Sequence, residues 1–278
     1  MSRNGHSPPA RAPQRPVAVF ALDFAQGQST GKHAHPFAQL VHGASGVMRV
    51  ITAHAAWIVP PGRAVWVPAG LEHNVQMVTS VQMRTVYLIP GALPGAPRES
   101  CVVPVAPLLR ELILEALRLP RPYPLGGAAE RLFGFLLERI SFEDVVPLHL
   151  PLPTSPALSR VAESLREDPS AQRTLAAWAK SAGLSTRTFA RVFHRETGLP
   201  FGAWRAQARL LKALELLSVG NTVTDVAISL GYESTSAFIH RFRRHLGTTP
   251  ARYFEDESSQ SKTQPEGARP LESRRRQV

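Results

Sequence analysis

The sequence predicts a two-domain α+β protein: an all-β barrel domain, a helical segment, and a C-terminal all-α domain with two helix-turn-helix motifs. Residues 17–104 consist of short apolar runs that Gly and Pro separate. Residues 175–195 and 223–244 each have the apolar spacing of two short helices packed across a tight turn. The formal net charge is +11, and residues 155–254 hold fourteen Lys and Arg against seven Asp and Glu. This distribution predicts an anionic partner for the second domain.

Both ends of the chain are polar. Residues 1–16 are expected to form a disordered arm and residues 255–278 a disordered tail. Between the arm and the helical segment lie seven runs of β-type composition, namely residues 17–24, 39–42, 47–51, 56–59, 65–67, 75–78 and 82–89. Short strands at this spacing are typical of an antiparallel sandwich or barrel rather than of βαβ units.

Two polar patterns lie within this β domain. Gly27 precedes His33-x-His35, Gln39 and Gly46, and Gly62 precedes Pro68-x-Gly70 and His73. The spacings and the gap between them resemble the two sequence motifs of the cupin β-barrel. In metal-binding cupins the first motif supplies two His and one Glu, and the second supplies one His. The resemblance implies a cupin-like barrel whose interior receives these side chains.

Gln39 stands where the cupin motif has Glu, and an amide is a poorer ligand for a hard dication than a carboxylate. His33, His35 and His73 alone could still bind a divalent metal such as Zn or Fe. A second interpretation is a metal-free pocket for an organic effector, formed by these histidines and Gln39 with Trp66 as a wall. Trp66 could instead be an ordinary core residue, and the histidines could be purely structural.

A helical segment and a linker follow the barrel. Residues 107–119 and 128–142 within segment 105–146 have amphipathic spacing, which predicts two helices. Residues 147–156 contain four prolines alternating with apolar residues. Proline disfavours helix, so this stretch is expected to be an extended linker.

The two helix-turn-helix motifs share one pattern. Gly183 marks the first turn, where positive φ is needed, and Ser185 is suited to cap the following helix. Gly231 marks the second turn, which is one residue longer. One such pattern is weak evidence for DNA binding, because buried helical hairpins share it, but two copies strengthen the inference. Residues 201–217 have helical spacing and would span ~25 Å between the two motifs.

Polar and basic residues fill the predicted outer face of the second helix in each motif. In the first they are Ser185, Thr186, Arg187, Thr188, Arg191 and Arg195, and in the second Ser234, Thr235, Ser236, His240, Arg241 and Arg244. Arginine can contact guanine edges or phosphates, and Thr can contact bases. Two such helices separated by ~34 Å would read about twenty base pairs of double-stranded DNA. The alternative is a solvated basic face without a ligand.

Residues 157–254 resemble the DNA-binding domain of the AraC/XylS regulators. The resemblance rests on the spacings Ala179/Gly183 and Ala227/Gly231 and on the closing motif from Gly247 to Tyr253. It implies a bacterial transcription regulator that binds promoter DNA and senses an effector with its N-terminal domain. It also implies a homodimer formed through the helical segment, although those helices could dock on their own barrel instead.

The arrangement of the whole chain resembles the subgroup of this family that contains regulators of nitroimidazole resistance. That resemblance implies a repressor, with a transporter gene as its target. The alternative is an activator of a catabolic or stress operon, which would contact RNA polymerase. A metal-dependent cupin enzyme with a DNA-binding appendage is a further alternative, and the missing Glu counts against it. The last alternative is a protein that binds nucleic acids without sequence preference.

Composition narrows the class of protein further. No run of eighteen apolar residues exists, so no membrane span is expected, and no signal peptide is recognised. The single Cys101 cannot form an internal disulfide. A reducing cytoplasmic location is therefore expected.

Overall fold

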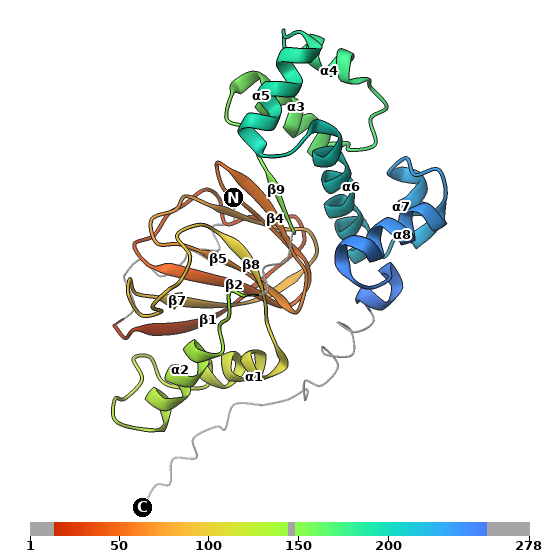
Figure 1. The fold of residues 1–278 in the computed structure, drawn as a ribbon. Coiled ribbons are helices and arrows are strands. Elements are labelled where there is room, and N and C mark those ends of the chain that lie inside the picture. The colour runs from red at the N-terminus through yellow and green to blue at the C-terminus, as the bar shows by residue number, and fades with distance from the viewer. Residues whose placement is uncertain (1–13, 144–147, 255–278) are drawn as a thin grey trace, which may run out of the picture.

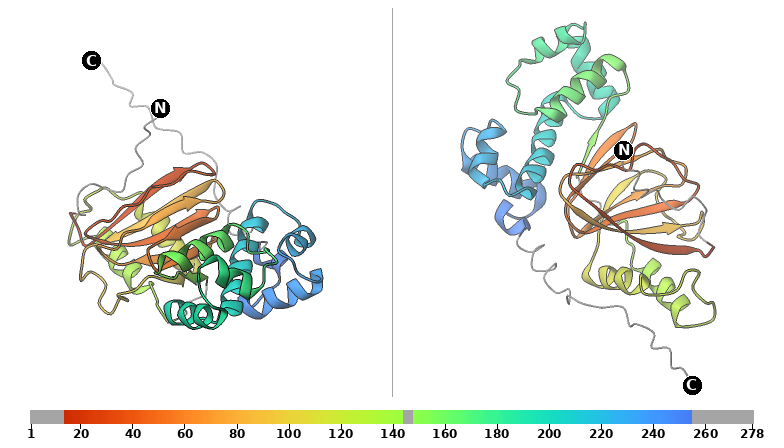
Figure 2. Two further views of the ribbon diagram at one scale, coloured as in Figure 1. Left: turned by 90° about the horizontal axis from the view of Figure 1, so that it is seen from above. Right: turned by 180° about the vertical axis from the view of Figure 1, so that it is seen from behind.

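The computed structural model of the chain describes residues 14–143 and 148–254 and has two domains, a β domain with two attached helices and a helical domain beside it (Figure 1). Residues 1–13 of the expected arm and the expected tail 255–278 lie outside the described residues. The helical domain lies along one side of the β domain in each view (Figure 2). Among the described residues, no helix is both long enough and apolar enough to cross a membrane.

The β domain is built from two antiparallel sheets, which confirms the predicted class. One sheet has the strand order β1-β7-β2-β5-β8, and the other β6-β3-β4-β9. The strands are β1 (Val17–Phe24), β2 (Ala38–Ser45), β3 (Met48–Ile51), β4 (Ala55–Val59), β5 (Arg63–Val67), β6 (Asn74–Met77), β7 (Val81–Leu88), β8 (Cys101–Pro104) and β9 (His149–Pro151). The first seven correspond to the seven predicted runs, whereas β8 and β9 were not predicted.

The two faces of the five-stranded sheet have different partners. Val41, Val65 and Met83 belong to the core shared with the second sheet. Their neighbours in sequence point the other way, as strand geometry requires, so Leu40 and Trp66 lie on the outer face. The helices α1 (Pro107–Ala116) and α2 (Ala128–Glu138) cover that outer face.

The two predicted helices of the central segment are thus docked on their own barrel. Ile113 and Phe133 belong to the same buried cluster as the outer face of the sheet. Leu108 and Phe135 remain 48% and 42% exposed. The buried sides of the helices are therefore occupied within the chain, as the alternative to dimerisation expected.

The predicted linker is extended, and part of it is paired with the barrel as a β-strand. His149–Pro151 forms β9, which pairs with β4 at the edge of the four-stranded sheet. The backbone N–H of Leu152 donates to His54 O at 2.7 Å, and that of Ile58 donates to Leu148 O at 3.1 Å. Pro151 is tolerated because an edge strand has one unpaired side. The connection between the domains is therefore part of the barrel.

The C-terminal domain is helical, as predicted. Its helices are α3 (Pro156–Glu167), α4 (Leu175–Ser181), α5 (Thr186–Thr197), α6 (Phe201–Ser218), α7 (Val223–Ser229) and α8 (Thr235–Leu246). The 18-residue α6 runs as a rod between the α4/α5 pair and the α7/α8 pair (Figure 1). Trp204 on α6 is fully buried and its ring lies 5.5 Å from that of Phe193. Tyr253 of the closing motif packs on Phe242 at 5.7 Å.

Two positions in the barrel are tightly constrained. Gly46 joins β2 to β3 with φ of +81°, and a Cβ there would lie 2.1 Å from Ser80 O. His42 on β2 is buried, and its Nδ1 lies 3.0 Å from Arg63 O. Burial lowers the pKa of His42 to about 4, and the charges of Arg110 and Arg84 add to the effect. The imidazole is therefore neutral in the folded protein and donates its Nδ1–H to the carbonyl.

Candidate DNA interface and candidate effector site

The α4/α5 pair has the geometry of a helix-turn-helix. Thr174 caps α4 by accepting from the Ala177 N–H at 3.2 Å, and Ser185 caps α5 by accepting from the Thr188 N–H at 3.2 Å. Gly183 adopts the predicted positive φ, +71°. A backbone bond from Leu184 N to Ala179 O, at 2.9 Å, closes the turn. The short turn fixes the angle between the helices, and Ala179 is buried where they cross.

The α7/α8 pair repeats this geometry. Gly231 has φ of +70°, and Tyr232 N donates to Ala227 O at 3.0 Å. Ser234 caps α8 by accepting from the Ala237 N–H at 3.1 Å. The extra turn residue predicted for this motif is present, since α8 begins four residues after Gly231 while α5 begins three after Gly183. Both predicted motifs are confirmed as helix pairs.

The predicted DNA-contacting side chains lie on α5 and α8 or at their caps. Ten of the twelve are exposed, and Thr188 and Thr235 are half-buried. Ser185 and Ser234 use their hydroxyl oxygens as helix caps, which leaves these groups for positioning rather than base reading. The exposed arginines of α5 are Arg187, Arg191 and Arg195.

The interpretation of the sequence missed one basic residue near α8. Arg209 of α6 lines a cavity of about 410 Å³ together with His240, Arg241 and Arg244 of α8. His245 lines it as well, so five basic side chains surround this cavity. Arg209 lies on a different helix, about thirty residues before His240, so no local pattern could associate the two. Arg209 is therefore a further candidate for contacts with DNA phosphates.

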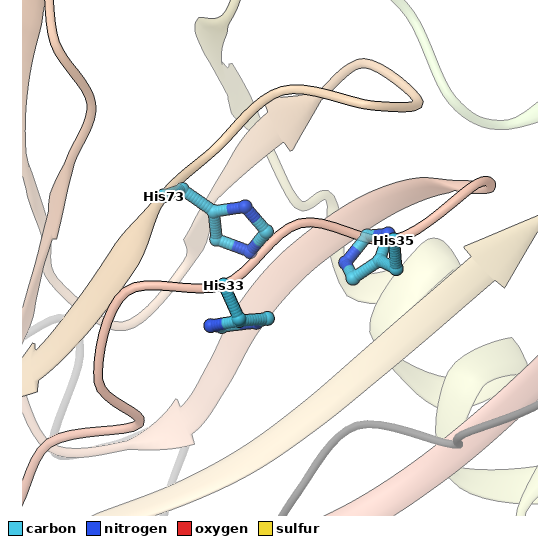
Figure 3. A group of neighbouring side chains, drawn as sticks. All are labelled: His33, His35 and His73. Atoms are coloured by element: carbon cyan, nitrogen blue, oxygen red, sulfur yellow. The ribbon is translucent and has the colours of Figure 1, made fainter.

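The barrel brings together the three histidines predicted from the cupin-like motifs (Figure 3). His33, His35 and His73 each offer one ring nitrogen, and these atoms lie within 4.8 Å of one another. His33 and His73 come from opposite segments, and their backbones pair through two bonds of 2.9 and 3.0 Å. His35 and His73 are buried, whereas His33 is half-buried.

Gln39 links two of these rings. Its Oε1 lies 3.0 Å from Nε2 of His35 and 3.1 Å from Nε2 of His73. Its Nε2 donates to Thr85 Oγ1 at 2.8 Å and to Tyr87 OH at 3.1 Å. Thr85 and Tyr87 were not predicted for this site. Their place on β7 opposite Gln39 becomes evident only from the strand register.

The protonation of the rings follows from their other contacts. Each Nδ1 lies within 2.7–2.9 Å of a backbone carbonyl, that of Gly31, Phe37 or Leu71. A carbonyl oxygen only accepts, so each Nδ1 carries a proton, and a ring in its neutral form presents its lone pair at Nε2. Burial lowers the pKa of His35, and it lowers the pKa of His73 to about 4, which favours the neutral form.

This donor set fits a divalent metal ion. Three imidazole nitrogens and an amide oxygen, all acceptors, face one another, and neutral imidazole is the form that ligates Zn or Fe. Two arrangements satisfy these atoms: a cation among them, or a reversed Gln39 amide that donates to His35 and His73. In the second arrangement Tyr87 donates to the amide oxygen, while the Thr85 hydroxyl donates to Leu40 O.

Trp66 does not belong to this site, so its assignment as a pocket wall was wrong. Trp66 pairs with Leu40 across the sheet, whereas Gln39 pairs with Val67. Side chains alternate along a strand, so Trp66 and Gln39 point to opposite faces. The Trp66 indole N–H donates to Pro97 O at 2.9 Å. Its ring packs against Phe142 at 5.4 Å, which confirms the alternative of core packing.

A second cavity lies between the two domains, beside the histidine cluster. Its volume is about 420 Å³, and His73 forms part of its wall. On the barrel side it is lined by Lys32, Arg49, Ile51, Thr52, Ala53, Glu72, Asn74 and Gln76, and on the helical side by Glu163, Arg166, Glu167 and Lys212. Ligands in this cavity would touch both domains.

An ion pair crosses the same junction. Arg49 of β3 donates to the Glu215 carboxylate of α6 through Nε, at 2.9 Å, and through Nη2. Lys212 Nζ lies 3.1 Å from the other carboxylate oxygen, and the Glu215 side chain is only 8% exposed. Trp204 donates from Nε1 to Pro151 O at 2.6 Å. Polar contacts thus attach α6 to both the barrel and β9.

Comparison with known proteins identifies the family. A family model described as an AraC-like ligand binding domain matches residues 18–146, and one described as a helix-turn-helix domain matches residues 178–256. The HTH-type transcriptional regulator NimR of Escherichia coli (strain K12) is 33% identical over 254 residues, which cover 91% of this chain and 92% of NimR. The chain belongs to the AraC family of transcriptional regulators.

This AraC-family regulator is also similar to the HTH-type transcriptional regulator RipA of Corynebacterium glutamicum. The two are 38% identical over 112 residues, 40% of this chain and 34% of RipA. The DNA-binding domain of AdpA, solved in complex with a target DNA, is 32% identical and matches 41% of this chain and 100% of that chain, with a TM-score of 0.35. The relatives confirm a DNA-binding transcriptional regulator rather than a cupin enzyme.

Proposed function

We propose that this regulator represses transcription from a promoter and that an effector bound in the barrel controls its affinity for DNA. The observation that supports an effector site is the cluster of His33, His35, Gln39 and His73, in which the half-buried His33 meets three buried polar side chains. Buried polar groups are costly unless they are satisfied. A divalent metal ion such as Zn or Fe, held by the three histidines, is the effector or the group that holds the effector.

The contacts at the domain junction connect this histidine cluster with the DNA-binding domain. His73 directly precedes β6, and Gln76 of β6 accepts from Arg49 Nη1 at 3.4 Å. Arg49 in turn binds Glu215 on α6, the helix that joins the two helix-turn-helix pairs. A ligand that shifts His73 therefore acts on a strand that touches the junction. Coupling requires that the ligand bind the two domain arrangements with different affinity.

The sign and target of regulation are part of the proposal. The resemblance of the whole chain to the subgroup that contains regulators of nitroimidazole resistance supports a repressor with a transporter gene as its target. The regulator would act in the cytoplasm as a homodimer, with Leu108 and Phe135 of the helical segment as exposed apolar contacts. Two copies would raise avidity for paired half-sites without any new base contact.

Selection of genomic DNA with the purified protein tests the proposal. Fragments bound at physiological salt would be sequenced and then footprinted with Zn²⁺ and with a chelator. We expect a protected site with two major-groove contacts one helical turn apart, and a change of affinity when metal is removed. Arg241→Ala should lose the preference for the selected site, whereas Arg131→Ala, an exposed arginine on α2, should keep it. Selection without any sequence enrichment under either condition would contradict a sequence-specific repressor.

A further inference from the structure

We infer that the histidine cluster, when it holds a divalent metal ion, also takes a small anion as an additional metal ligand, so that metal retention depends on that anion. The inference rests on the metal site proposed above and concerns its charge balance. It names the chemical class of the effector, a small carboxylate or similar oxyanion that reaches the metal from the cavity between the domains.

The side chains that would bind the metal ion carry no negative charge. The Nδ1 contacts with Gly31, Phe37 and Leu71 place a proton on each Nδ1, so each ring can bind a metal only through Nε2, as an uncharged donor. Gln39 adds an uncharged amide where the cupin motif has a carboxylate. Among the described residues, the group of potential ligands at this place contains histidines and no Asp, Glu or Cys. A dication in this cluster would therefore keep its full charge.

Burial makes this charge costly. His35, Gln39 and His73 are 6%, 3% and 1% exposed. An ion that is buried without a counter-charge is strongly disfavoured, so an accompanying anion stabilises the loaded site. With the Gln39 oxygen the protein offers four neutral donors, and an anion would add a fifth ligand, a coordination number that zinc sites with an exchangeable ligand also reach. The additional ligand is therefore expected to be negatively charged.

The surroundings provide access and cations. His73 lines the cavity of about 420 Å³, and Lys32, adjacent to His33 in sequence, lines it as well. Across the cavity stands Arg166 of α3. Within the described part of the chain neither Lys32 nor Arg166 forms a salt bridge. These two cations can attract an anion toward the cluster.

Acidic side chains limit what the cavity can select. Glu72 on the barrel side and Glu163 and Glu167 on the helical side also line it, so the cavity as a whole is not strongly positive. Selection for an anion must then come from the metal ion, with Lys32 and Arg166 adding positive charge on the two sides of the cavity. This points to a small monoanion that binds end-on, rather than to a polyanion that would fill the cavity.

The test uses the full chain with Co²⁺, whose visible absorption reports coordination, and acetate as the anion. Co²⁺ affinity would be measured against a competing chelator, with ionic strength held constant by perchlorate, a weak ligand. At acetate about one hundred times its Kd for the loaded site, the apparent Co²⁺ affinity should rise about 100-fold, because metal and anion binding are linked. The absorption of bound Co²⁺ should change at the same acetate concentrations.

Gln39→Glu places the missing charge in the protein and provides a second measurement. It should bind Co²⁺ at least about tenfold more tightly without acetate, a gain of about 1.4 kcal/mol, and it should respond to acetate by less than about twofold. The control Gln76→Glu adds the same charge at the cavity wall outside the cluster and should keep the wild-type dependence on acetate. The wild-type titration tests the inference even if Gln39→Glu fails to fold.

The outcomes separate the inference from the proposal on which it rests. Stoichiometric Co²⁺ binding whose affinity and spectrum do not respond to acetate would overturn the anion requirement and leave the metal site standing. Folded protein that binds no Co²⁺ with or without acetate would overturn both. Equal gains in Gln39→Glu and Gln76→Glu would show general electrostatic attraction and would likewise overturn a metal-bound anion.

Discussion

The Arg49–Glu215 ion pair is expected to hold the DNA-binding domain against the barrel, and a double-mutant cycle can measure this. At an effective dielectric of about 20, two unit charges ~4 Å apart attract by about 4 kcal/mol. The Arg49 and Glu215 side chains are 24% and 8% exposed, so the free-energy cost of removing them from water offsets a large part of this attraction. We expect a coupling free energy of about 2 kcal/mol between Arg49→Met and Glu215→Gln. Glu215→Gln alone should cost about 3 kcal/mol, because two cations then stay near a buried neutral group.

Amide hydrogen exchange in the native state is the appropriate assay, because a two-domain protein need not unfold in one step. The amides of Ile58 and Leu152 report on β9, since their hydrogen bonds attach the extended segment to β4. Their opening free energies should fall in the single variants and recover in part in the double variant. Arg118→Gln is the matched control. Its salt bridge with Glu115 lies on the surface, with side chains 77% and 50% exposed, so its loss should cost only about 0.5 kcal/mol.

A coupling free energy below about 0.5 kcal/mol would refute this reasoning, because the pair would then behave like an exposed salt bridge. Unchanged exchange at Ile58 and Leu152 in Glu215→Gln would also refute it. In that case the apolar contacts of α6 and the Trp204–Pro151 hydrogen bond would hold the junction without the ion pair.

Three further predictions concern DNA reading, pH and backbone conformation. Arg191→Ala should weaken binding to the selected DNA site by about 1–3 kcal/mol, measured by gel shift, and an equal loss on random DNA would contradict base reading. The folded-state pKa of His42, about 4, lies below the unfolded value of 6.5, so the unfolded chain binds the extra proton. Stability is therefore full above pH 6.5 and falls as pH drops toward 4, by about 3 kcal/mol from this residue. With a chelator present, His42→Asn should reduce the fall of the urea-unfolding free energy over this range by that amount and leave the part due to His35 and His73, whereas the exposed-site control His54→Asn should not change it. Gly46→Ala should destabilise by at least about 2 kcal/mol, because it combines positive φ with a clash, whereas Gly70→Ala, with φ of +79° and open space, should cost about 1 kcal/mol. Equal melting temperatures for the two alanine variants would show that the turn at Gly46 adjusts freely.

The helical domain was predictable because its determinants are local. Gly183 and Ser185 lie within three residues of each other and fix the turn and the cap of one motif. Their effect depends on backbone conformation and on hydrogen bonds to the next few residues. The histidine cluster was also predictable in part, because the spacing of His33 and His35 carries over from a known β motif.

The parts that were missed depend on pairing between distant segments. The apolar run 65–67 gives no indication of which face is inside, since Val65 and Val67 are as apolar as Trp66. Only the register with β2 places Trp66 outside. Similarly, Arg49 and Glu215 are 166 residues apart, and neither has a local feature that marks it as a partner. The junction between the domains could therefore not be derived from sequence patterns.

Strand β9 has a consequence for the DNA sites that this regulator can use. A free linker would let the DNA-binding domain change its orientation relative to the barrel. In this protein only residues 152–155 separate β9 from α3, so that freedom is small. In a dimer, the DNA-binding domains of the two subunits would therefore keep a nearly fixed distance and orientation relative to each other. Inserting about five base pairs, half a helical turn, between operator half-sites would turn one half-site to the far side of the duplex. Promoters recognised by this protein should accordingly tolerate changes of base sequence better than changes of spacing.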